Sequence, residues 1–329
     1  MKVLFCSKAF PNAFELLKVL LPDEDVFSCE REHVVRLGMA TDVLIPLMHR
    51  LEPELIEGTA AKLIHQWGVG LEGVDIAAAT ARGIMVCNVP GDATANADST
   101  AEHALFLMLA VARRIHECFG AFHQGAWGTP LGQALGGGAA LIVGLGRVGK
   151  ALARKLVALG MNVQAVRRSA NIEMEAALGL VGAGNMSRLY EMASSADFVI
   201  STIALTDHTR ALFNRDLFRV MKPSAFVINV SRGPVIVESD LVEALRTGEI
   251  AGAGLDVYEQ EPLDPNNPLL ILPNVVATPH IGGVTRQNYD GIARIVTDNI
   301  LRVKCGKVPM YCVNESALKA QKDLLRTTG

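Results

Sequence analysis

A glycine-rich turn near the middle of the chain constrains its fold more than any other feature. Gly144, Gly146 and Gly149 form a Gly-x-Gly-x-x-Gly pattern between the apolar run 140–143 and a helix-forming stretch that reaches about residue 159. In this context the first glycine permits a tight turn, the second lets a pyrophosphate approach the backbone, and the third allows close packing of helix on strand. The turn therefore predicts a dinucleotide-binding unit. A glycine-rich turn that binds no ligand is the alternative.

Two arginines at the end of the next expected strand, 162–166, bear on the choice of nucleotide. Arg167 lies 18 residues beyond Gly149, about where the residue that contacts the adenine ribose is expected, and Arg168 follows it. An acidic residue there binds the 2′-hydroxyl group of NAD, whereas arginine suits the 2′-phosphate of NADP. We therefore expect NADP to be favoured over NAD. The alternative is a pair of solvated surface arginines.

The pattern along the whole chain is an alternation of short apolar runs and helical periods, which predicts an α/β fold with parallel sheets. Strands are expected at 2–6, 43–46, 62–67, 85–89, 140–143, 162–166, 198–202, 226–230, 253–257 and 275–278. Helices are expected at 12–20, 53–59, 239–246 and 285–304. A long, largely apolar helix should begin with Ser99 or Thr100 as its N-cap and run to about Phe122. The polar C-terminal residues should be ordered only in part.

Composition argues against several kinds of partner. The 329 residues carry a formal net charge of −3, so no basic surplus favours nucleic acid or an anionic membrane. No apolar run is long enough to cross a bilayer, and the N-terminus is better explained as a first strand than as a signal peptide. The six cysteines include no C-x-x-C pair, and no His or Cys cluster has metal-ligand spacing. We expect a cytoplasmic protein with reduced thiols and no metal site.

Three side chains in the second half of the chain each follow an apolar run. Arg232, Glu261 and His280 supply a cation, a carboxylate and an imidazole in a chain that also has a nucleotide turn. Such a set suits a redox reaction in which the arginine holds an anionic substrate, the histidine moves a proton, and the carboxylate stabilises the protonated ring. A nicotinamide cofactor would supply the hydride. Taken singly, they could be an interior histidine, a helix-cap arginine and a solvated glutamate.

An ordered set of motifs extends over roughly residues 40 to 300. These segments are 68–75, 96–103, 144–149, 205–210, 229–233, 255–262 and 279–283. In this order they resemble the D-isomer-specific 2-hydroxyacid dehydrogenase family. The resemblance implies a flavodoxin-like substrate domain built from 1–100 and 290–329, with a Rossmann-type dinucleotide-binding domain, 101–289, inserted between them. It also implies that the reactants bind between the two domains.

The family resemblance also implies roles for matched positions. Arg232 would hold the carboxylate and keto oxygen of the substrate, and His280, paired with Glu261, would protonate that oxygen. Val69 and Gly70 would offer backbone N–H groups to the substrate carboxylate. Asp256 would lie on the nicotinamide side of the cofactor. The remaining cofactor positions are Thr100, Arg147, Val148, Thr209, Val230 and Gly282, beside the glycine turn and the two arginines.

Some features depart from the family pattern, and two residues argue against particular branches of the family. Ala204 replaces a common proline, residues 136–138 are all glycine, and the loop 90–99 is long. These departures affect the expected shape of the loops, but they leave the expected chemistry of the site unchanged. The sequence does not predict which way the side chains of the substrate loop 46–50 point. Glu261 argues against the formate dehydrogenase branch, which has glutamine there, and Val69 argues against the phosphite dehydrogenase branch, which has lysine.

The expected activity is the reduction of a small 2-oxo acid to the D-2-hydroxy acid, as in a glyoxylate or hydroxypyruvate reductase. D-3-phosphoglycerate dehydrogenase stays open as an alternative. A nucleotide-sensing binding protein, similar to the transcriptional corepressor relatives, is an alternative of another class. The apolar surplus of the helix expected near 101–122, together with the family resemblance, predicts a homodimer.

Overall fold

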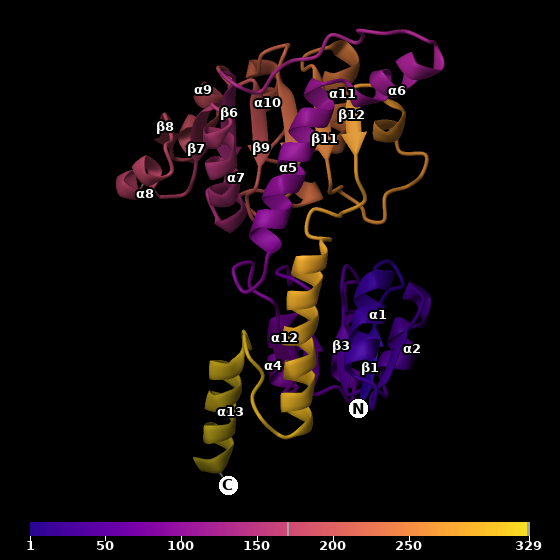
Figure 1. The fold of residues 1–329 in the computed structure, drawn as a ribbon. Helices are drawn as coiled ribbons and strands as arrows, with labels where there is room; N and C mark the ends of the chain where they lie inside the picture. Colours follow the sequence, from indigo (N-terminus) through magenta and orange to yellow (C-terminus); the bar gives the residue numbers. More distant parts are fainter. Residues whose placement is uncertain (170, 328–329) are drawn as a thin grey trace. The chain divides into compact units, whose positions relative to one another are not determined.

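The computed structural model describes residues 1–169 and 171–327 and divides the chain into two compact units (Figure 1). Unit 1 contains Met1–Ala95 together with the segment that begins at Arg286, and unit 2 is Asn96–Thr285. Unit 2 is therefore inserted between two pieces of unit 1. The boundaries lie a few residues from those expected at 100/101 and 289/290. Which unit binds which reactant stays a prediction.

Unit 1 is built on a five-stranded parallel sheet in the order β2-β1-β3-β4-β5. Its strands are β1 Lys2–Phe5, β2 Asp25–Ser28, β3 Val43–Ile45, β4 Leu63–His65 and β5 Met85–Cys87. The apolar runs expected as strands are buried between helices on both faces, as parallel sheets require. Strand β2 was not predicted, because Asp25 and Ser28 make this edge strand look polar.

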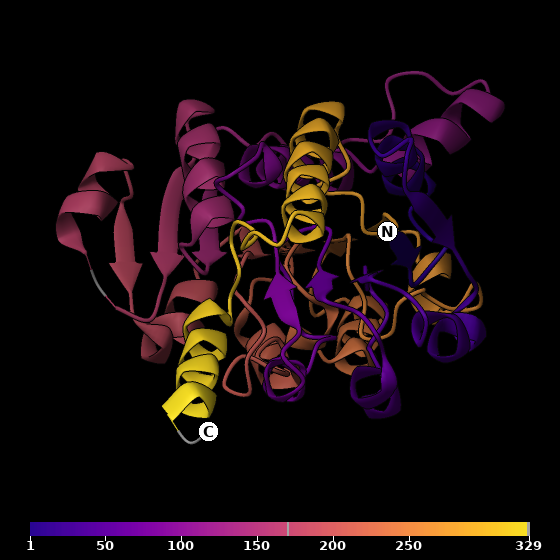
Figure 2. The same cartoon turned by 90° about the horizontal axis from the view of Figure 1, so that it is seen from below.

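Helices cover the sheet of unit 1. They are α1 Pro11–Leu20, α2 Val34–Gly38, α3 Pro53–Gly58, α4 Ile76–Ala81, α12 Arg286–Lys304 and α13 Glu315–Thr327. The last two, yellow in Figure 2, are joined by the segment 305–314. Helix α13 is amphipathic, buries Leu318 and extends to Thr327. The expected partial order of the last residues stays a prediction, because residues 328–329 lie outside the described part of the chain.

Unit 2 is built on a seven-stranded parallel sheet in the order β12-β11-β10-β9-β6-β7-β8. Its strands are β6 Ala139–Val143, β7 Asn162–Val166, β8 Gly182–Gly184, β9 Phe198–Ser201, β10 Phe226–Asn229, β11 Gly252–Leu255 and β12 Val275–Ala277. Strand β8 was not predicted because Gly-Ala-Gly carries no β-branched or aromatic residue. From β6 the chain first adds β7 on one side and later β9 on the other. A switch of this kind opens a crevice at the carboxyl ends of these strands.

Helices of unit 2 pack on both faces of its sheet. They are α5 Asn96–Ala112, α6 Ile115–His123, α7 Arg147–Ala158, α8 Ile172–Ala177, α9 Leu189–Ala193, α10 Arg215–Val220 and α11 Glu238–Thr247. Helices α5 and α7 lie side by side across one face (Figure 1). Helix α11 ends at Gly248 in the left-handed conformation, as its sequence predicts.

The long helix expected from Ser99 or Thr100 to about Phe122 was wrong at both ends. Helix α5 already begins at Asn96, so Ser99 and Thr100 are buried inside its first turns and do not cap it. It stops at Ala112, and Arg114 takes a φ of 54° before α6 starts. A left-handed residue breaks the i to i−4 hydrogen-bond ladder, so the chain forms two helices.

No helix within the described residues is both long and apolar enough to span a membrane.

Candidate active site

The glycine turn lies between β6 and α7, at the switch point of the unit 2 sheet. Gly144 has a φ of 102°, and a Cβ atom there would lie 2.6 Å from Ile203 Cα. A Cβ on Gly149 would overlap Gly144 O, so helix and turn are in contact. Both positions therefore require glycine because a side chain there would clash with other atoms of the protein itself.

Gly146 differs from the two other glycines of the turn. A Cβ at this position would meet no atom within 4 Å, so nothing in the protein requires glycine there. Gly146 is also the N-cap of α7, with no side-chain cap. An open approach to uncapped N–H groups at a helix start is what a pyrophosphate group needs. The turn therefore fits a dinucleotide.

The two arginines after β7 are not equivalent. Arg167 is partly buried, and its Nη1 lies 3.8 Å from Glu175 Oε1 and 3.8 Å from Met174 Sδ on α8. Arg168 is exposed. The sequence placed Arg167 at the expected ribose-contact position, but it could not predict the contact of Arg167 with α8, which depends on the fold. An incoming phosphate would meet Arg168 in solvent, whereas Arg167 already faces a carboxylate.

Arg232 follows β10 in a tight turn that its own polar residues close. Buried Asn229 donates from Nδ2 to Arg232 O at 3.1 Å and accepts from Ser231 N and Oγ at 3.1 and 2.8 Å. The Arg232 guanidinium is partly buried and donates to Ser231 O at 2.8 Å. A Cβ on the next residue, Gly233, would overlap Tyr258 O, so this turn packs directly against the loop after β11.

Glu261 and His280 form the ionisable pair that their sequence order suggested. Glu261 Oε2 lies 2.7 Å from His280 Nδ1, and Glu261 Oε1 accepts from Tyr258 N at 2.8 Å. Both carboxylate oxygens are thus engaged, which fixes the carboxylate beside the ring. The Glu261 side chain is 13 % exposed and that of His280 33 % exposed, so the charge near the ring is only weakly screened.

The backbone of His280 is strained. Its φ is 54°, in the left-handed region that non-glycine residues seldom occupy, and its N–H donates to Asp256 O at 2.9 Å. The next two N–H groups, of Ile281 and Gly282, donate to the Asp256 carboxylate at 2.8 Å each. Strain of this kind persists only where surrounding contacts hold it, and here Asp256 supplies three of them.

Buried Asp256 is itself held in the charged form. Burial raises the pKa of its carboxyl group, but hydrogen bonds from His103, Thr278 and Ile281 N, with the charge of His103, lower it below the ordinary value. Thr278 Oγ1 donates to Asp256 Oδ1 at 2.7 Å, and His103 Nε2 lies 3.3 Å from the same oxygen. The carboxylate therefore stays ionised while it anchors the turn that carries His280.

Two residues of this network were missed by the sequence reasoning. His103 on α5 was not proposed as a site residue, yet its Nε2 lies 2.8 Å from Thr278 Oγ1 and 3.3 Å from Asp256 Oδ1. Thr278 was interpreted only as a strand end. The signal for His103 was its place in the matched motif 96–103. Nothing in the spacing predicts that α5 brings it to the carboxyl end of β12.

The other predicted cofactor positions lie on several elements of unit 2. Thr100 on α5 faces Gly282, since a Cβ on that glycine would be 3.5 Å from Thr100 Cγ2. Thr209 Oγ1 accepts from Thr206 N and donates to Ala204 O, both at 2.7 Å, so it shapes the loop after β9. The remaining three follow β6 or β10: Arg147, Val148 and Val230. Their contacts with a cofactor stay predictions.

Val69 and Gly70 lie in unit 1, in the loop after β4. Asn88 Nδ2 donates to Val69 O at 2.7 Å, which fixes the peptide plane between Val69 and Gly70. Gly68, just before them, has a φ of 133°. The backbone conformation is thus well defined, and the expected contact with a substrate carboxylate stays a prediction.

Within the described part of the chain, no group of His, Cys, Asp or Glu side chains has the arrangement of a metal site.

Comparisons with known proteins agree with this geometry. Residues 105–282 match the family model described as "D-isomer specific 2-hydroxyacid dehydrogenase, NAD binding domain". A glyoxylate reductase of Thermococcus kodakarensis is 34 % identical over 97 % of this chain and 98 % of its own. A D-3-phosphoglycerate dehydrogenase of Archaeoglobus fulgidus is 35 % identical over 95 % of this chain and 59 % of its own.

A solved structure has the same fold. The NADPH-dependent glyoxylate/hydroxypyruvate reductase of Sinorhizobium meliloti, in complex with NADP and malonate, aligns with a TM-score of 0.78 and 29 % identity over 96 % of this chain and 97 % of its own.

A parallel sheet with a glycine turn at its switch point, followed by the arginine turn and the Glu–His pair, is the arrangement of an NAD(P)-dependent oxidoreductase. The chain belongs to the D-isomer specific 2-hydroxyacid dehydrogenase family.

Replacing Glu261 with glutamine tests the ionisable pair. A negative charge 2.7 Å from the ring stabilises protonated His280, so its removal makes the protonated form less stable. If His280 is the acid of the reduction, the reaction needs the protonated ring, and the alkaline limb of the pH–rate profile should move to lower pH. Steady-state rates of 2-oxo acid reduction across pH measure this, with Glu243→Gln on the exposed face of α11 as the control. An unchanged alkaline limb would show that Glu261 does not stabilise the protonated form of the group that donates the proton.

Proposed function

We propose that this protein reduces a small 2-oxo acid to the corresponding D-2-hydroxy acid, with NADPH as the preferred hydride donor. The observation that carries the proposal is the Glu261–His280 pair at 2.7 Å, on the sheet edge that also bears the glycine turn and Arg232. Unit 2 therefore offers a proton donor in His280, a cation for the substrate in Arg232 and a nucleotide site in the glycine turn. A cytoplasmic location is part of the proposal.

Arg232 orients the substrate in this proposal. Its planar guanidinium can hold a carboxylate oxygen and the neighbouring keto oxygen together, which a single point charge cannot do. The closed turn 229–232 keeps the guanidinium partly buried, where its interaction with an anion is strengthened. The requirement for both oxygens selects 2-oxo acids over aldehydes and simple ketones.

His280 donates the proton to the keto oxygen. Its Nδ1 is engaged by Glu261, so Nε2 is the atom that transfers the proton. The turn fixed by Asp256 orients the ring, and the partly buried Glu261 carboxylate stabilises the imidazolium before the proton leaves. Bound NADPH would supply the hydride. In the reverse reaction the same histidine accepts the proton from the hydroxy acid.

Cofactor preference is tested at the two arginines. Arg168, exposed after β7, should contribute a charge-assisted contact to the 2′-phosphate worth about 1.5–3 kcal/mol. Arg168→Ala should therefore lower kcat/KM for NADPH about tenfold or more and leave NADH little changed. Arg167→Asp should narrow the preference too, although Arg167 already contacts Glu175. Kinetics with both nucleotides, with Arg219→Ala as a surface control, decide this. An unmodified enzyme that favours NADH would refute the assignment.

The substrate class is tested by a panel of acids. The expected order of kcat/KM places glyoxylate and hydroxypyruvate above bulkier 2-oxo acids and above 3-phosphohydroxypyruvate. Chiral analysis of the product should show the D isomer. An L product, or no turnover with any member of the panel, would contradict the proposal.

D-3-phosphoglycerate dehydrogenase is the second candidate. It is favoured by the 35 % identity to the Archaeoglobus fulgidus enzyme, although this chain spans only 59 % of that relative. Within unit 2, the cationic groups of the proposed substrate site are Arg232 and protonated His280, and the carboxylate and keto group would occupy both. A clear preference for 3-phosphohydroxypyruvate in the same panel would transfer the assignment to this enzyme.

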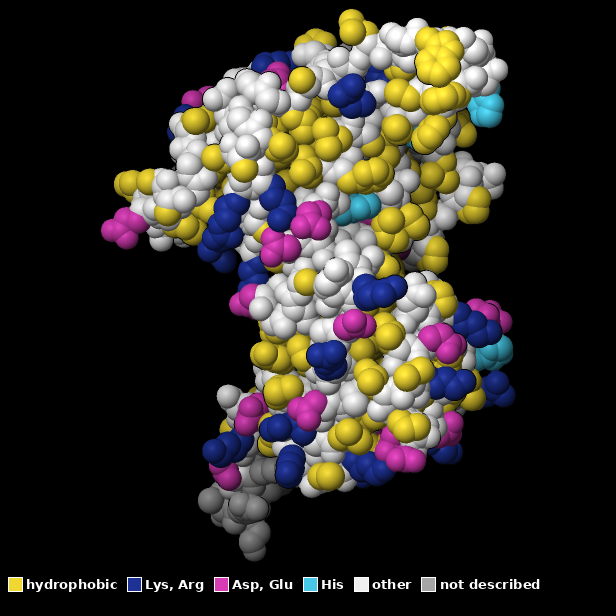
Figure 3. Space-filling model, in the orientation of Figure 1, with side chains coloured by type: hydrophobic (Ala, Val, Ile, Leu, Met, Phe, Trp, Pro, Cys, Tyr) yellow, Lys and Arg dark blue, Asp and Glu magenta, His cyan; other side chains and the backbone are white. Residues whose placement is uncertain are grey.

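A homodimer through unit 2 belongs to the same proposal. Large apolar side chains are exposed on α6 and the segment after it, and Figure 3 shows apolar side chains gathered over this region. They are Phe119, Phe122, Trp127 and Leu131. Exposed apolar patches of this kind are typical of association surfaces, and two-fold symmetry is the most common arrangement.

A further inference from the structure

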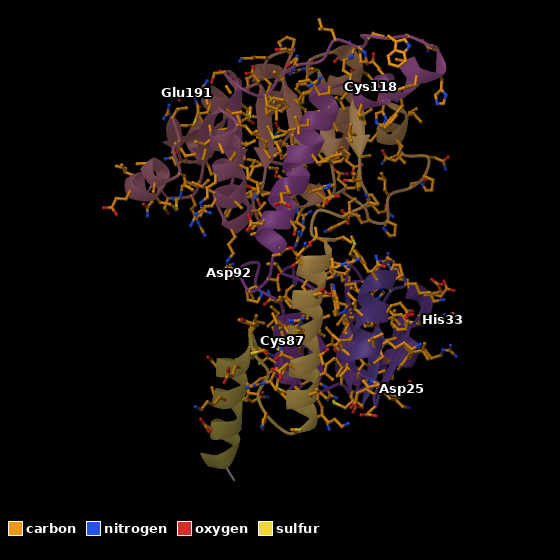
Figure 4. All side chains as sticks on the ribbon, viewed as in Figure 1. Asp25, His33, Cys87, Asp92, Cys118 and Glu191 are labelled. Atoms are coloured by element: carbon orange, nitrogen blue, oxygen red, sulfur yellow. The ribbon has the colours of Figure 1, made fainter. Side chains whose placement is uncertain are left out.

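Two cysteines that are far apart in the sequence meet at the edge of the unit 1 sheet. Cys87 is the last residue of β5, the edge strand, and Figure 4 labels it there. Cys312 lies in the segment between α12 and α13 and pairs with Cys87 as an isolated antiparallel bridge. Residues 87 and 312 belong to the two different pieces of chain that make up unit 1.

The type of bridge determines how closely the two side chains approach. Val313 N donates to Val86 O at 2.8 Å, so the hydrogen bond joins the flanking residues and not the cysteines themselves. This is the pattern of a non-hydrogen-bonded antiparallel pair, in which the two Cα atoms lie about 4.5 Å apart with their side chains close together. A disulfide requires Cα atoms about 4.4–6.8 Å apart. The backbone therefore already lies within the range of a disulfide.

Asn314 holds the register of this bridge. It is buried, its Oδ1 accepts from Val86 N at 2.9 Å, and its Nδ2 donates to Ile84 O at 2.9 Å and to Thr80 Oγ1 at 2.8 Å. These three bonds fasten the start of α13 to β5 and to the end of α4. The hydrogen bonds of Asn314 thus hold Cys312 opposite Cys87.

The environments of the two thiols suit them to different steps of one reaction. Cys87 is fully buried, whereas Cys312 is partly exposed and can meet a small reagent. The hydrogen bond from the Cys87 thiol lowers the pKa of Cys312 to about 7, although burial opposes this, and the same bond with burial raises the pKa of Cys87. Cys312 is therefore the attacking thiolate and Cys87 the second thiol.

We propose that Cys87 and Cys312 form a redox-sensitive pair that a low-molecular-weight disulfide converts into an intrachain disulfide. The Cys312 thiolate attacks one sulfur of the reagent, and the S–S bond of the reagent breaks to release one thiolate. Cys87 then loses its proton, attacks Sγ of Cys312 in the mixed disulfide and releases the second thiolate, which takes up that proton. Two protein thiols are oxidised and one reagent disulfide is reduced to two thiols.

The bond would change the connectivity of unit 1. Both chain crossings between the units lie between Cys87 and Cys312, so the disulfide closes a loop that contains all of unit 2. Cross-links that close long loops restrict the unfolded chain most. Oxidation should also fix α13 to β5 covalently. This redox pair is independent of the proposed function, because it requires only the bridge, its anchor and the two thiols.

Oxidation with glutathione disulfide tests the proposal. The reduced full-length chain is incubated with excess glutathione disulfide, remaining thiols are alkylated, and peptides are identified by mass spectrometry. The expected product is a linked Cys87–Cys312 peptide that dithiothreitol removes. Cys312→Ser should abolish it, and Cys87→Ser should leave glutathione attached to Cys312. Cys305→Ser, at an exposed cysteine, is the matched control and should still form the link.

A second measurement follows the consequence for the fold. Oxidised chain should unfold at a higher temperature than reduced chain, and amides of α13 should exchange hydrogen more slowly. Both differences should vanish in Cys312→Ser, whose partly exposed position makes it the safer variant if Cys87→Ser fails to fold. The proposal is overturned if glutathione attaches to Cys305 while Cys87 and Cys312 stay alkylated. It is equally overturned if the unmodified chain retains glutathione on Cys312 without forming the link.

Discussion

Replacing His280 with asparagine should lower kcat for 2-oxo acid reduction by roughly 10²–10⁴-fold, the usual contribution of a general acid. Asparagine tolerates the left-handed backbone that His280 adopts, with a φ of 54°, better than most residues do. The turn anchored by Asp256 should therefore persist, and the loss should report the missing proton donor and not a collapsed loop.

The binding of the nucleotide separates this result from unfolding. The affinity for NADPH should barely change in His280→Asn, because the glycine turn lies on a different strand of the same sheet. His123→Asn, at an exposed histidine on α6, serves as the control and should keep full activity. If His280→Asn retained more than a tenth of the activity, another group would have to supply the proton.

Replacing Arg232 with lysine should reduce kcat/KM for glyoxylate by about 10- to 100-fold or more. Lysine keeps the positive charge but cannot hold the carboxylate and keto oxygens together, and each lost charge-assisted hydrogen bond is worth about 1.5–3 kcal/mol. Because the keto oxygen gains charge during reduction, kcat should fall as well as KM rise.

The matched control for this variant is Arg215→Lys. Arg215 is a surface arginine paired with Asp240 at 3.7 Å and should lose no activity on replacement. The NADPH affinity of Arg232→Lys should stay near that of the unmodified protein. A variant with normal kcat/KM would mean that Arg232 supports the turn 229–232 and does not bind the substrate.

The strained turn at His280 shows how the fold supports such chemistry. Holding a non-glycine residue at an unusual φ costs on the order of 1–3 kcal/mol. Asp256 offsets this cost by accepting from three successive N–H groups, two through its carboxylate and one through its carbonyl group. The carboxylate in turn stays charged because His103 and Thr278 hydrogen-bond to it in a buried position.

Local features were predictable from the sequence. The glycine turn is recognisable because strand, turn and helix are contiguous, and Gly144 and Gly149 take the tight contacts that their spacing implies. The parallel α/β class and most strands follow from buried apolar runs, which need no knowledge of their neighbours. The order Arg232, Glu261, His280 likewise indicated a set, since the carboxyl ends of parallel strands meet at one edge of a sheet.

Elements that depend on distant contacts were not predictable. The polar strand β2 and the glycine-containing strand β8 exist because neighbouring strands offer hydrogen bonds to their backbones. The break of the long helix at Arg114 is a backbone conformation that its apolar pattern does not reveal. The amphipathic helix α13 is held at its start by Asn314, whose partners lie in a remote segment of the sequence.

The sequence by itself determined the class of fold, the nucleotide turn and the chemical types of the site residues, because each is encoded within a short stretch of chain. Only the tertiary structure decided which groups meet. It placed His103 beside Asp256, turned Arg167 toward Glu175 and left Arg168 exposed, and set Cys87 opposite Cys312. The physical reason is that each pairing joins different elements, whose distance and direction are fixed by packing and not by spacing along the chain.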